Sequence, residues 1–332
     1  MTEPAAADTP NPALPKDIAD VQAGLLAHDY VADRQLATAV FLALRLQRPL
    51  FLEGEPGTGK TEIARTLSTL LARPLIRLQC YEGLDLAGAA YEWNYGRQML
   101  EIRLAESVHP EAHDNDQGPS PGRGGSDRVR SDALADELFS ERFLIQRALL
   151  QAIDPQRAVP PVLLIDELDR ADEPFEAFLL EVLSDFQITI PEYGTVKAKT
   201  PPIVVLTSNR TREIHDAVKR RCLYHWVGFP DAAREFQIVQ RRVPGVPQQL
   251  AQQVVAFVQK LRTIELYKLP GIAETIEWAR ALMELDALVL DPAVIQDTLG
   301  VLLKYQDDIA RMQGGEAARI LEEVRGAARA AG

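Results

Sequence analysis

Residues 54–61, with the sequence GEPGTGKT, restrict the fold of this chain more than any other segment. They fit the pattern G-x-x-x-x-G-K-[ST], in which glycines let backbone N–H groups turn toward phosphate oxygens. The short apolar run 49–52 precedes them, as in a strand buried on both faces, and a helix is expected to begin near Lys60. A helix N-terminus adds positive potential at the same place. The sequence therefore predicts a phosphate-binding loop between a strand and a helix.

The loop composition indicates how the phosphates of a nucleotide and Mg²⁺ would be bound. Lys60 is expected to reach the β- and γ-phosphates, and the Thr61 hydroxyl to coordinate Mg²⁺. Adenine is expected to pack near Tyr30, Val31 and Ala32, ahead of the first strand. The residues expected to contact the phosphates are Glu55, Pro56, Gly57, Thr58, Gly59, Lys60 and Thr61.

Further short apolar runs alternate with helical patterns along the first two thirds of the chain. Strands that alternate with helices predict an α/β fold with a doubly wound parallel sheet. The runs expected to form the other strands are 74–78, 162–165, 203–206 and, less clearly, 223–227.

Two acids follow the apolar run 162–165. A carboxylate at the carboxyl end of a parallel strand points into the ligand crevice beside the phosphate loop. Asp166 is expected to hold Mg²⁺, mainly through water, and Glu167 to polarise the attacking water. The alternative is an acidic helix cap, because residues 166–172 are generally acidic. The phosphate loop upstream favours the catalytic interpretation.

Asn209 follows the apolar run 203–206 and the polar pair Thr207-Ser208. An amide at that strand end could hydrogen-bond both the γ-phosphate and the attacking water. The alternative is an ordinary turn residue, since Asn is common at loop starts. Together with the two preceding motifs, Asn209 is interpreted as a sensor of the γ-phosphate.

Composition shifts divide the chain into segments. Residues 1–17 are rich in Ala and Pro and are expected to form a disordered leader, and 18–229 a nucleotide-binding α/β domain. Within it, 106–132 is nearly free of large apolar residues and is expected to be a mobile insert. Residues 230–332 show helical patterns only and are expected to form a helical lid domain. Its helices are expected at 231–242, 247–264, 274–290, 292–305 and 316–328.

Charge and composition argue for a cytoplasmic protein. The formal net charge is −12, which argues against nonspecific nucleic-acid binding. No run of about 18 apolar residues suggests a membrane span, and the N-terminus lacks the pattern of a signal peptide. The two cysteines, Cys80 and Cys222, cannot make a disulfide framework.

The three motifs GEPGTGKT, VLLIDE and VVLTSN, in this order, resemble the phosphate loop, acidic strand and sensor-one strand of an AAA+ P-loop ATPase. Residues 163–185 and 201–226 are similar to the MoxR-type branch, and within it to the CoxD-like group that accompanies carbon monoxide dehydrogenase maturation. Residues 78–85, LQCYEGLD, resemble that group too. The resemblance covers about residues 18–290.

The resemblance implies a homo-oligomer, a ring hexamer with ATP between subunits, in which a neighbour's arginine stabilises charge on the γ-phosphate. Arg221 is the first candidate for this finger and Arg220 the second; the alternative is a solvated basic helix end. Arg210 and Arg212 are weaker candidates for intersubunit contacts. The lid lacks an arginine at the expected sensor-two place, and Arg280 could substitute.

The resemblance also implies partners: a von Willebrand A-domain protein and a client metalloenzyme, a molybdenum hydroxylase of the carbon monoxide dehydrogenase type. The function it implies is Mg-dependent ATP hydrolysis that drives chaperone-like remodelling of that client. Two other functions stay open, a DNA-linked AAA+ motor or clamp loader and an ATP-gated scaffold with little turnover. The net charge argues against the first, and Glu167 with Arg220 and Arg221 against the second.

Two further segments have competing interpretations. The aromatic residues between Tyr81 and Tyr95 could grip a client in a ring pore, or could pack a small insertion, which is favoured. Residues 187–196 are predicted to form a β-hairpin with a Pro/Gly turn, which could contact a partner or shape a subunit interface.

Overall fold

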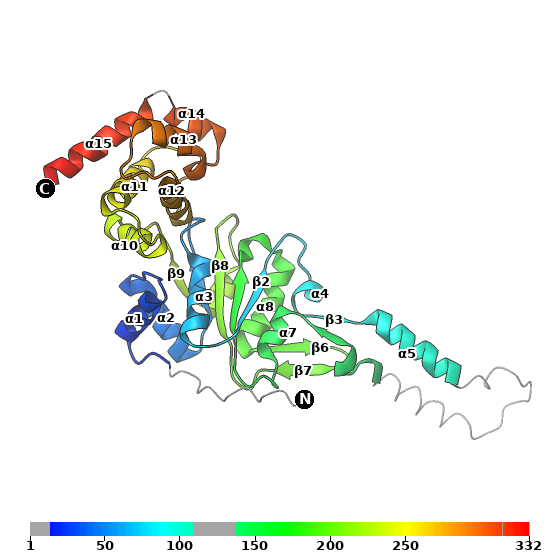
Figure 1. Ribbon diagram of the computed structural model, residues 1–332. Coiled ribbons are helices and arrows are strands. Elements are labelled where there is room, and N and C mark those ends of the chain that lie inside the picture. The colour runs from blue at the N-terminus through cyan, green and yellow to red at the C-terminus, as the bar shows by residue number, and fades with distance from the viewer. Residues whose placement is uncertain (1–13, 109–136, 314, 332) are drawn as a thin grey trace, which may run out of the picture.

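The described part of the chain is a parallel sheet covered by helices on both faces and joined to a helical unit (Figure 1). The structure is a computed structural model, and the residues it describes are 14–108, 137–313 and 315–331. Most of the expected leader and insert, residues 1–13 and 109–132, therefore lie outside the described residues. Asp17, at the end of the expected leader, caps the first helix through its side chain.

The central sheet has five parallel strands in the order β2-β5-β8-β1-β9. The strand that precedes the phosphate loop, Leu50–Glu53, lies between the strand that ends at Ser208 and the strand that ends at Trp226. Because all five strands run the same way, their carboxyl ends meet at one edge of the sheet. The strands are β1 (Leu50–Glu53), β2 (Leu75–Gln79), β5 (Val162–Asp166), β8 (Ile203–Ser208) and β9 (Leu223–Trp226).

The strands alternate between two cores, as expected of a sheet with helices on both faces. Leu50 and Leu52 pack in one cluster with the first three helices, whereas Phe51 belongs to the cluster on the opposite face. Figure 1 shows α3 on one face and α7 and α8 on the other. The first face carries α1 (Ile18–Ala27), α2 (Arg34–Leu46) and α3 (Lys60–Leu70); the second carries α7 (Ala148–Ile153), α8 (Glu173–Asp185) and α9 (Asp216–Arg221).

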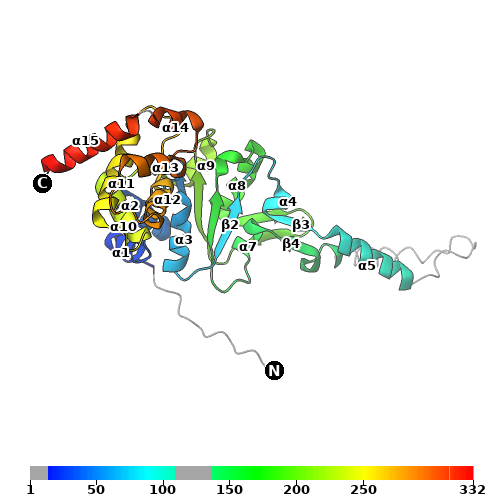
Figure 2. The same ribbon diagram turned by 45° about the horizontal axis from the view of Figure 1, so that its top comes forward.

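The C-terminal helices form a separate hydrophobic cluster. Trp278 is fully buried at its centre, 5.4 Å from the ring of Phe257, and its indole N–H donates to Thr298 Oγ1 at 2.7 Å. Figure 2 shows this helical unit beside α1, α2 and α3. Its helices are α10 (Ala232–Arg242), α11 (Gln248–Leu261), α12 (Ile272–Glu284), α13 (Pro292–Leu302), α14 (Gln306–Met312) and α15 (Glu316–Ala331).

Two helical stretches differ from the expectation. The helix expected at 274–290 ends at Glu284, since Asp286 takes a positive φ of 54° and the chain turns away. Leu288, whose apolar side chain extended the apparent pattern, is 71% exposed. The stretch 292–305 ends as a helix at Leu302, and α14 is a separate helix. Periodicity could not locate these breaks, because they are made by backbone conformation.

Smaller elements lie between β2 and β8. The predicted hairpin is confirmed as β6 (Gln187–Ile190) paired antiparallel with β7 (Gly194–Lys197). Two short strands, β3 (Tyr91–Trp93) and β4 (Leu144–Gln146), pair antiparallel beside α4 (Leu86–Ala89).

Helix α5 (Tyr95–Val108) extends away from the sheet (Figure 1). The expected mobile insert begins at Glu106, so its first three residues belong to this helix instead. Among the nearby aromatic residues, Trp93 is buried and stacks edge-on against Phe139, whereas Tyr81 and Tyr95 are exposed. The packing interpretation therefore fits Trp93 and the half-buried Tyr91, which packs against the same core. None of the helices that the structure describes has the length and apolar character needed to cross a bilayer.

The two thiols are expected to be unreactive in the folded protein. Cys80 and Cys222 are buried, and burial raises the pKa of each to about 12. Since the thiolate is the reactive form, iodoacetamide at pH 8 should leave both unmodified until a denaturant unfolds the chain. Mass spectrometry of the alkylated protein measures this, with glutathione as the control for reagent activity. Rapid alkylation of the native protein at either position would contradict the packing described above.

Candidate functional site

The phosphate loop connects β1 to α3, and its Gly57 lies in tight contact with Gly271 of the helical unit. Gly57 has a φ of +75°, and a Cβ there would lie 2.9 Å from Glu274 Oε2. A Cβ on Gly271 would lie 2.9 Å from Gly57 Cα. The backbones are close enough for Ile272 N–H to donate to the Gly57 carbonyl at 2.9 Å. The loop and the first turn of α12 therefore meet through their main chains.

The N-terminus of α3 faces the same space. Gly59 caps the helix with a φ of +89°, a conformation that a side chain would strain. The backbone N–H groups of residues 57–60 have no hydrogen-bond acceptor within the described part of the chain. Unpaired N–H groups at a helix N-terminus form an anion-binding site.

Lys60 is the buried cation of this loop. Its side chain is 5% exposed, and Nζ donates to the carbonyls of Gly54 at 2.8 Å and Glu55 at 2.7 Å. Burial lowers the pKa of Lys60 to about 8, although the acids nearby act in the opposite direction. Both acceptors are neutral carbonyls, and a phosphate group would give this ammonium group a negatively charged partner.

The acidic strand lies next to the loop. Asp166 is 2% exposed, and its Oδ1 accepts hydrogen bonds from Thr61 Oγ1 at 2.9 Å and from Thr207 Oγ1 at 2.6 Å. Its Oδ2 accepts from Arg77 Nε at 3.1 Å and from Arg77 Nη2 at 2.6 Å. The residues predicted to share a metal are thus in direct contact.

Glu167 follows β5 in the left-handed conformation, with a φ of +55°. This conformation is uncommon for a residue with a side chain and costs about 1 kcal/mol or more. Three donors hold the carboxylate: Asn209 Nδ2 at 3.3 Å, Gln79 Nε2 at 3.1 Å and Arg170 Nε at 2.9 Å. The predicted catalytic acid and the predicted sensor amide are therefore hydrogen-bonded to each other.

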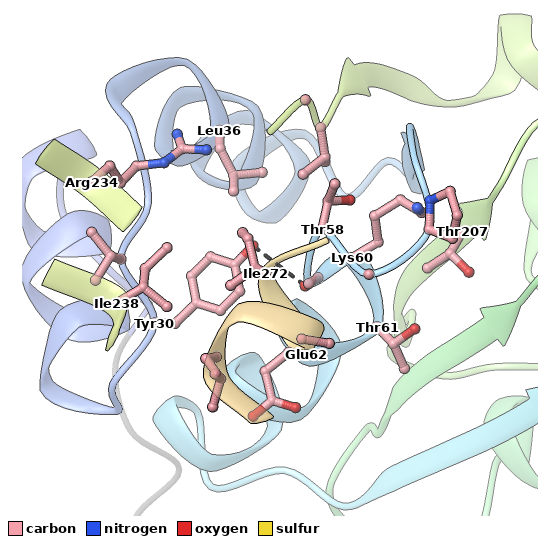
Figure 3. A pocket seen from close by; sticks show the side chains of 18 of the residues that line it. Tyr30, Leu36, Thr58, Lys60, Thr61, Glu62, Thr207, Arg234, Ile238 and Ile272 are labelled. Atoms are coloured by element: carbon pink, nitrogen blue, oxygen red, sulfur yellow. Dashed lines mark hydrogen bonds between the residues drawn. The ribbon is translucent and has the colours of Figure 1, made fainter. Parts of the chain in front are cut away.

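A cavity of about 400 Å³ joins these groups to the helical unit. Figure 3 shows Leu36, Ile238 and Ile272 gathered around the ring of Tyr30, with Lys60 and Thr61 beyond it. The Tyr30 hydroxyl donates to the Gly59 carbonyl at 3.5 Å. The lining residues that were predicted from the sequence are Tyr30, Val31, Pro56, Gly57, Thr58, Gly59, Lys60, Thr61, Asp166, Glu167 and Asn209.

Glu55 and Ala32 were also expected at the nucleotide but do not line the cavity. Glu55 contributes its main-chain carbonyl to Lys60 and Thr58 instead. The Ala32 carbonyl accepts from Gln22. The lining of the cavity also includes Tyr30 and Val31 together with residues of α2 and α10.

The oxygen donors beside the loop suit Mg²⁺. Thr61 contributes a hydroxyl and Asp166 a carboxylate, the hard oxygen ligands that Mg²⁺ prefers. No cluster of three His, Cys, Asp or Glu side chains within the described ranges could hold a metal. A magnesium ion at this place would therefore need phosphate oxygens and water to complete six ligands.

The arginines predicted for intersubunit contacts lie outside the cavity. Arg221 donates within its own chain, to Ser184 Oγ and to the Ala217 carbonyl at 3.0 Å. Arg220 is exposed, and its side chain contacts no partner among the described residues. Arg212 pairs with the buried Glu176, and Arg210 with Glu213 at 3.3 Å.

Arg280, considered as a substitute for a sensor-two arginine, does not line the cavity and donates to the Arg242 carbonyl at 2.9 Å. The arginines that do line the cavity are Arg234 and Arg242, on α10. Arg234 pairs with Asp33, and Arg242 pairs with Glu62 at 3.0 Å. These two ion pairs join the helical unit to α2 and α3.

Residues 49–222, more than half of the chain, match the AAA domain (dynein-related subfamily). The match includes the phosphate loop, the acidic strand and the strand that ends before Asn209. The chain belongs to this AAA family. It has the AAA+ P-loop fold, and it is an ATPase.

Solved structures similar to this AAA ATPase include chains of RuvB from Thermotoga maritima. A single-residue variant has 16% identity and a TM-score of 0.46, with 83% of this chain and 71% of that chain covered. The Holliday junction branch migration motor has 16% identity and a TM-score of 0.41, with 81% and 67% covered. No curated protein matches the sequence.

The sequence analysis missed several residues in and around the cavity of the AAA ATPase. Arg77 and Gln79 do not line the cavity, but they contact the two acids. The sequence analysis placed Arg77 only in the apolar run 74–78 and Gln79 only in the segment 78–85. The missed signal was their alternation, since residues two apart on a strand face the same way. His225 also lines the cavity, and burial lowers the pKa of its imidazole.

Proposed function

We propose that this AAA ATPase hydrolyses ATP with Mg²⁺ to remodel a protein client, in the manner of the MoxR-type branch. The observation that carries the hydrolytic part is the convergence of Lys60, Thr61, Asp166, Glu167 and Asn209 on one cavity. The MoxR-like segments 163–185 and 201–226 support the choice of a protein client. The cytoplasm is the proposed compartment.

Each residue has a proposed role in hydrolysis. Lys60 and the amides of the phosphate loop bind phosphates, and Thr61 and Asp166 bind Mg²⁺. When bound, Mg²⁺ neutralises charge on the phosphate oxygens. Glu167 accepts the proton of the attacking water, and Asn209 orients that water. Of these residues, Glu167 is held by the contacts that most limit its proposed role.

Glu167 must lose contacts before it can act as a base. Gln79, Asn209 and Arg170 all donate to its two carboxylate oxygens. Three donated hydrogen bonds occupy most of the acceptor positions of a carboxylate, so little of it is left to accept from the attacking water. Hydrolysis therefore follows a rearrangement in which Gln79 or Arg170 moves away from Glu167.

We propose a ring hexamer in which the neighbouring subunit supplies an arginine to the γ-phosphate. The geometry favours Arg220 over Arg221, reversing the order expected from the sequence. Arg221 is already engaged with Ser184 and Ala217, whereas Arg220 is exposed and free to reach across an interface. A finger must be free because it acts on a site in another subunit.

Replacement of Arg220 by alanine is expected to lower turnover of the assembled ATPase by about 10³-fold, and Arg221→Ala much less. Mixing Arg220→Ala with Glu167→Gln should restore part of the turnover, because each subunit supplies what its neighbour lacks. Steady-state phosphate release at matched ring concentration measures this. Wild-type turnover in the Arg220→Ala protein would refute the assignment.

The proposed client is a metalloenzyme, a molybdenum hydroxylase of the carbon monoxide dehydrogenase type, reached through a von Willebrand A-domain protein. Deleting the coding sequence should leave this hydroxylase present but inactive. The wild-type sequence should restore its activity, whereas one encoding Glu167→Gln should not. Immunoblots of the hydroxylase polypeptide control for expression. Full hydroxylase activity in the deletion strain would contradict the proposed client.

A nucleic-acid client is tested in the same preparation. We expect duplex and single-stranded DNA to leave the turnover of the purified protein unchanged. Stimulation by about tenfold or more would favour the DNA-linked motor instead.

A further inference from the structure

Arg77 places its positive charge beside the Asp166 carboxylate, which the proposed function assigns as a ligand of Mg²⁺. It lies on the edge strand β2, which pairs with β5 so that Gln79 is opposite Asp166. Its guanidinium donates twice to Asp166 Oδ2, at 3.1 Å and 2.6 Å. The same guanidinium also donates to Gln79 Oε1, so it is fixed from two sides.

Asp166 depends on Arg77 for the neutralisation of its charge. Thr61 and Thr207 both donate to Oδ1, whereas Oδ2 accepts hydrogen bonds from Arg77 alone among the described residues. The nearby Lys60 donates to main-chain carbonyls instead. The Asp166 side chain is 3% exposed, and a buried charge without a partner is strongly destabilising.

We propose that Arg77 is a counter-ion for Asp166 in the nucleotide-free protein and competes with Mg²⁺ for that carboxylate. This inference rests on the proposed function, since it concerns the metal assigned there. Two cations at one buried carboxylate repel each other strongly, because the surroundings screen charge poorly. Binding of the metal with nucleotide therefore weakens the contact between Arg77 and Asp166.

The position of Arg77 gives the displaced guanidinium a place to go. Its side chain is 44% exposed, whereas the carboxylate it contacts is buried. An edge strand has no further strand on its outer side, so the long side chain can rotate into solvent without disturbing the sheet. The charge is then hydrated rather than left in the site.

A different role for Arg77 predicts the opposite result. If it only oriented Asp166 for the metal, its loss would weaken metal binding. If it competes with the metal, its loss strengthens metal binding. The effect of Arg77→Ala on the coupling between metal and nucleotide therefore separates the two roles by sign.

The first measurement is thermal unfolding in EDTA, without nucleotide. Arg77→Ala should lower the melting temperature by about 3 °C, because Asp166 loses its counter-ion. The matched control is Arg147→Ala, which removes an equally exposed arginine (45%) from a 2.7 Å ion pair with Glu92. We expect no shift in the control. An unchanged melting temperature in Arg77→Ala would overturn the counter-ion role.

The second measurement is the affinity for a fluorescent, nonhydrolysable ATP analogue, mant-AMPPNP, in EDTA and in Mg²⁺. The ratio of the two dissociation constants reports metal–nucleotide coupling. In Arg77→Ala the dissociation constant in EDTA divided by that in Mg²⁺ should be about tenfold larger than in wild type. A factor of ten corresponds to one charge-assisted hydrogen bond, and Arg77→Lys should give an intermediate ratio. Arg147→Ala should leave it unchanged.

The outcomes distinguish this inference from the proposed function. If wild type binds the analogue and hydrolyses ATP but Arg77→Ala has an equal or smaller ratio, competition is wrong and the proposed function stands. If wild type does not bind the analogue in either buffer, the proposed function and the competition both fail. The melting temperatures in EDTA then still decide whether Arg77 neutralises Asp166.

Discussion

Replacing Glu167 with glutamine is expected to lower the rate of ATP hydrolysis by about 10²- to 10³-fold and to leave nucleotide binding intact. Glutamine has nearly the same shape as glutamate but cannot accept a proton. Lys60, Thr61 and the loop amides, which are proposed to bind the phosphates, are unchanged by this substitution. Single-turnover phosphate release and mant-ATP affinity, measured on the same preparation, separate the chemical step from binding.

The control for this substitution is Glu173→Gln, which makes the same chemical change at an exposed position in the first turn of α8. We expect its turnover to equal that of the wild type. Unchanged turnover in Glu167→Gln would contradict the catalytic assignment. Loss of nucleotide binding would show that Glu167 is needed for the structure of the cavity.

The second large effect is expected in the helical unit, where Arg262→Met should lower the free energy of unfolding by about 3–5 kcal/mol. Arg262 pairs with the fully buried Glu235 through two hydrogen bonds, at 2.7 Å and 2.8 Å, and its side chain is 7% exposed. Its Nε also donates to the Pro270 carbonyl. Removing the arginine leaves the Glu235 carboxylate buried without its counter-ion.

The double variant Arg262→Met with Glu235→Leu is expected to recover much of that stability, since replacing a whole buried ion pair by apolar side chains is often neutral. Urea unfolding followed by circular dichroism gives the free energies. Arg147→Ala, at an exposed pair, should stay within about 1 kcal/mol of the wild type. Equal losses in the single and double variants would show that packing, not charge, sets the cost.

The central part of the site could be predicted because it lies where sequence position fixes spatial position. Lys60, Asp166 and Asn209 each follow an apolar run, and the carboxyl ends of parallel strands meet at one edge. The loop and the strand ends could be predicted without knowing how distant segments of the chain pack together. The fold class followed from the same alternation of strands and helices.

The rest depended on contacts between segments far apart in the sequence. Arg77 meets Asp166 only because β2 pairs with β5 in one particular register, and no local pattern states that register. The Glu235–Arg262 pair joins two helices whose polar positions look like solvent-facing residues. Arg220 and Arg221 are neighbours in sequence, and only the hydrogen bonds of Arg221 to Ser184 and Ala217 distinguish the two side chains.

The contact between Gly57 and Ile272 joins the phosphate loop to α12 through main-chain atoms alone. Any substitution of Ile272 except proline would therefore keep this backbone donor. A shift of the loop carbonyl on nucleotide release would be transmitted to the start of α12 whatever side chain follows. This contact connects the helical unit to the phosphate loop without an arginine that reaches the cavity.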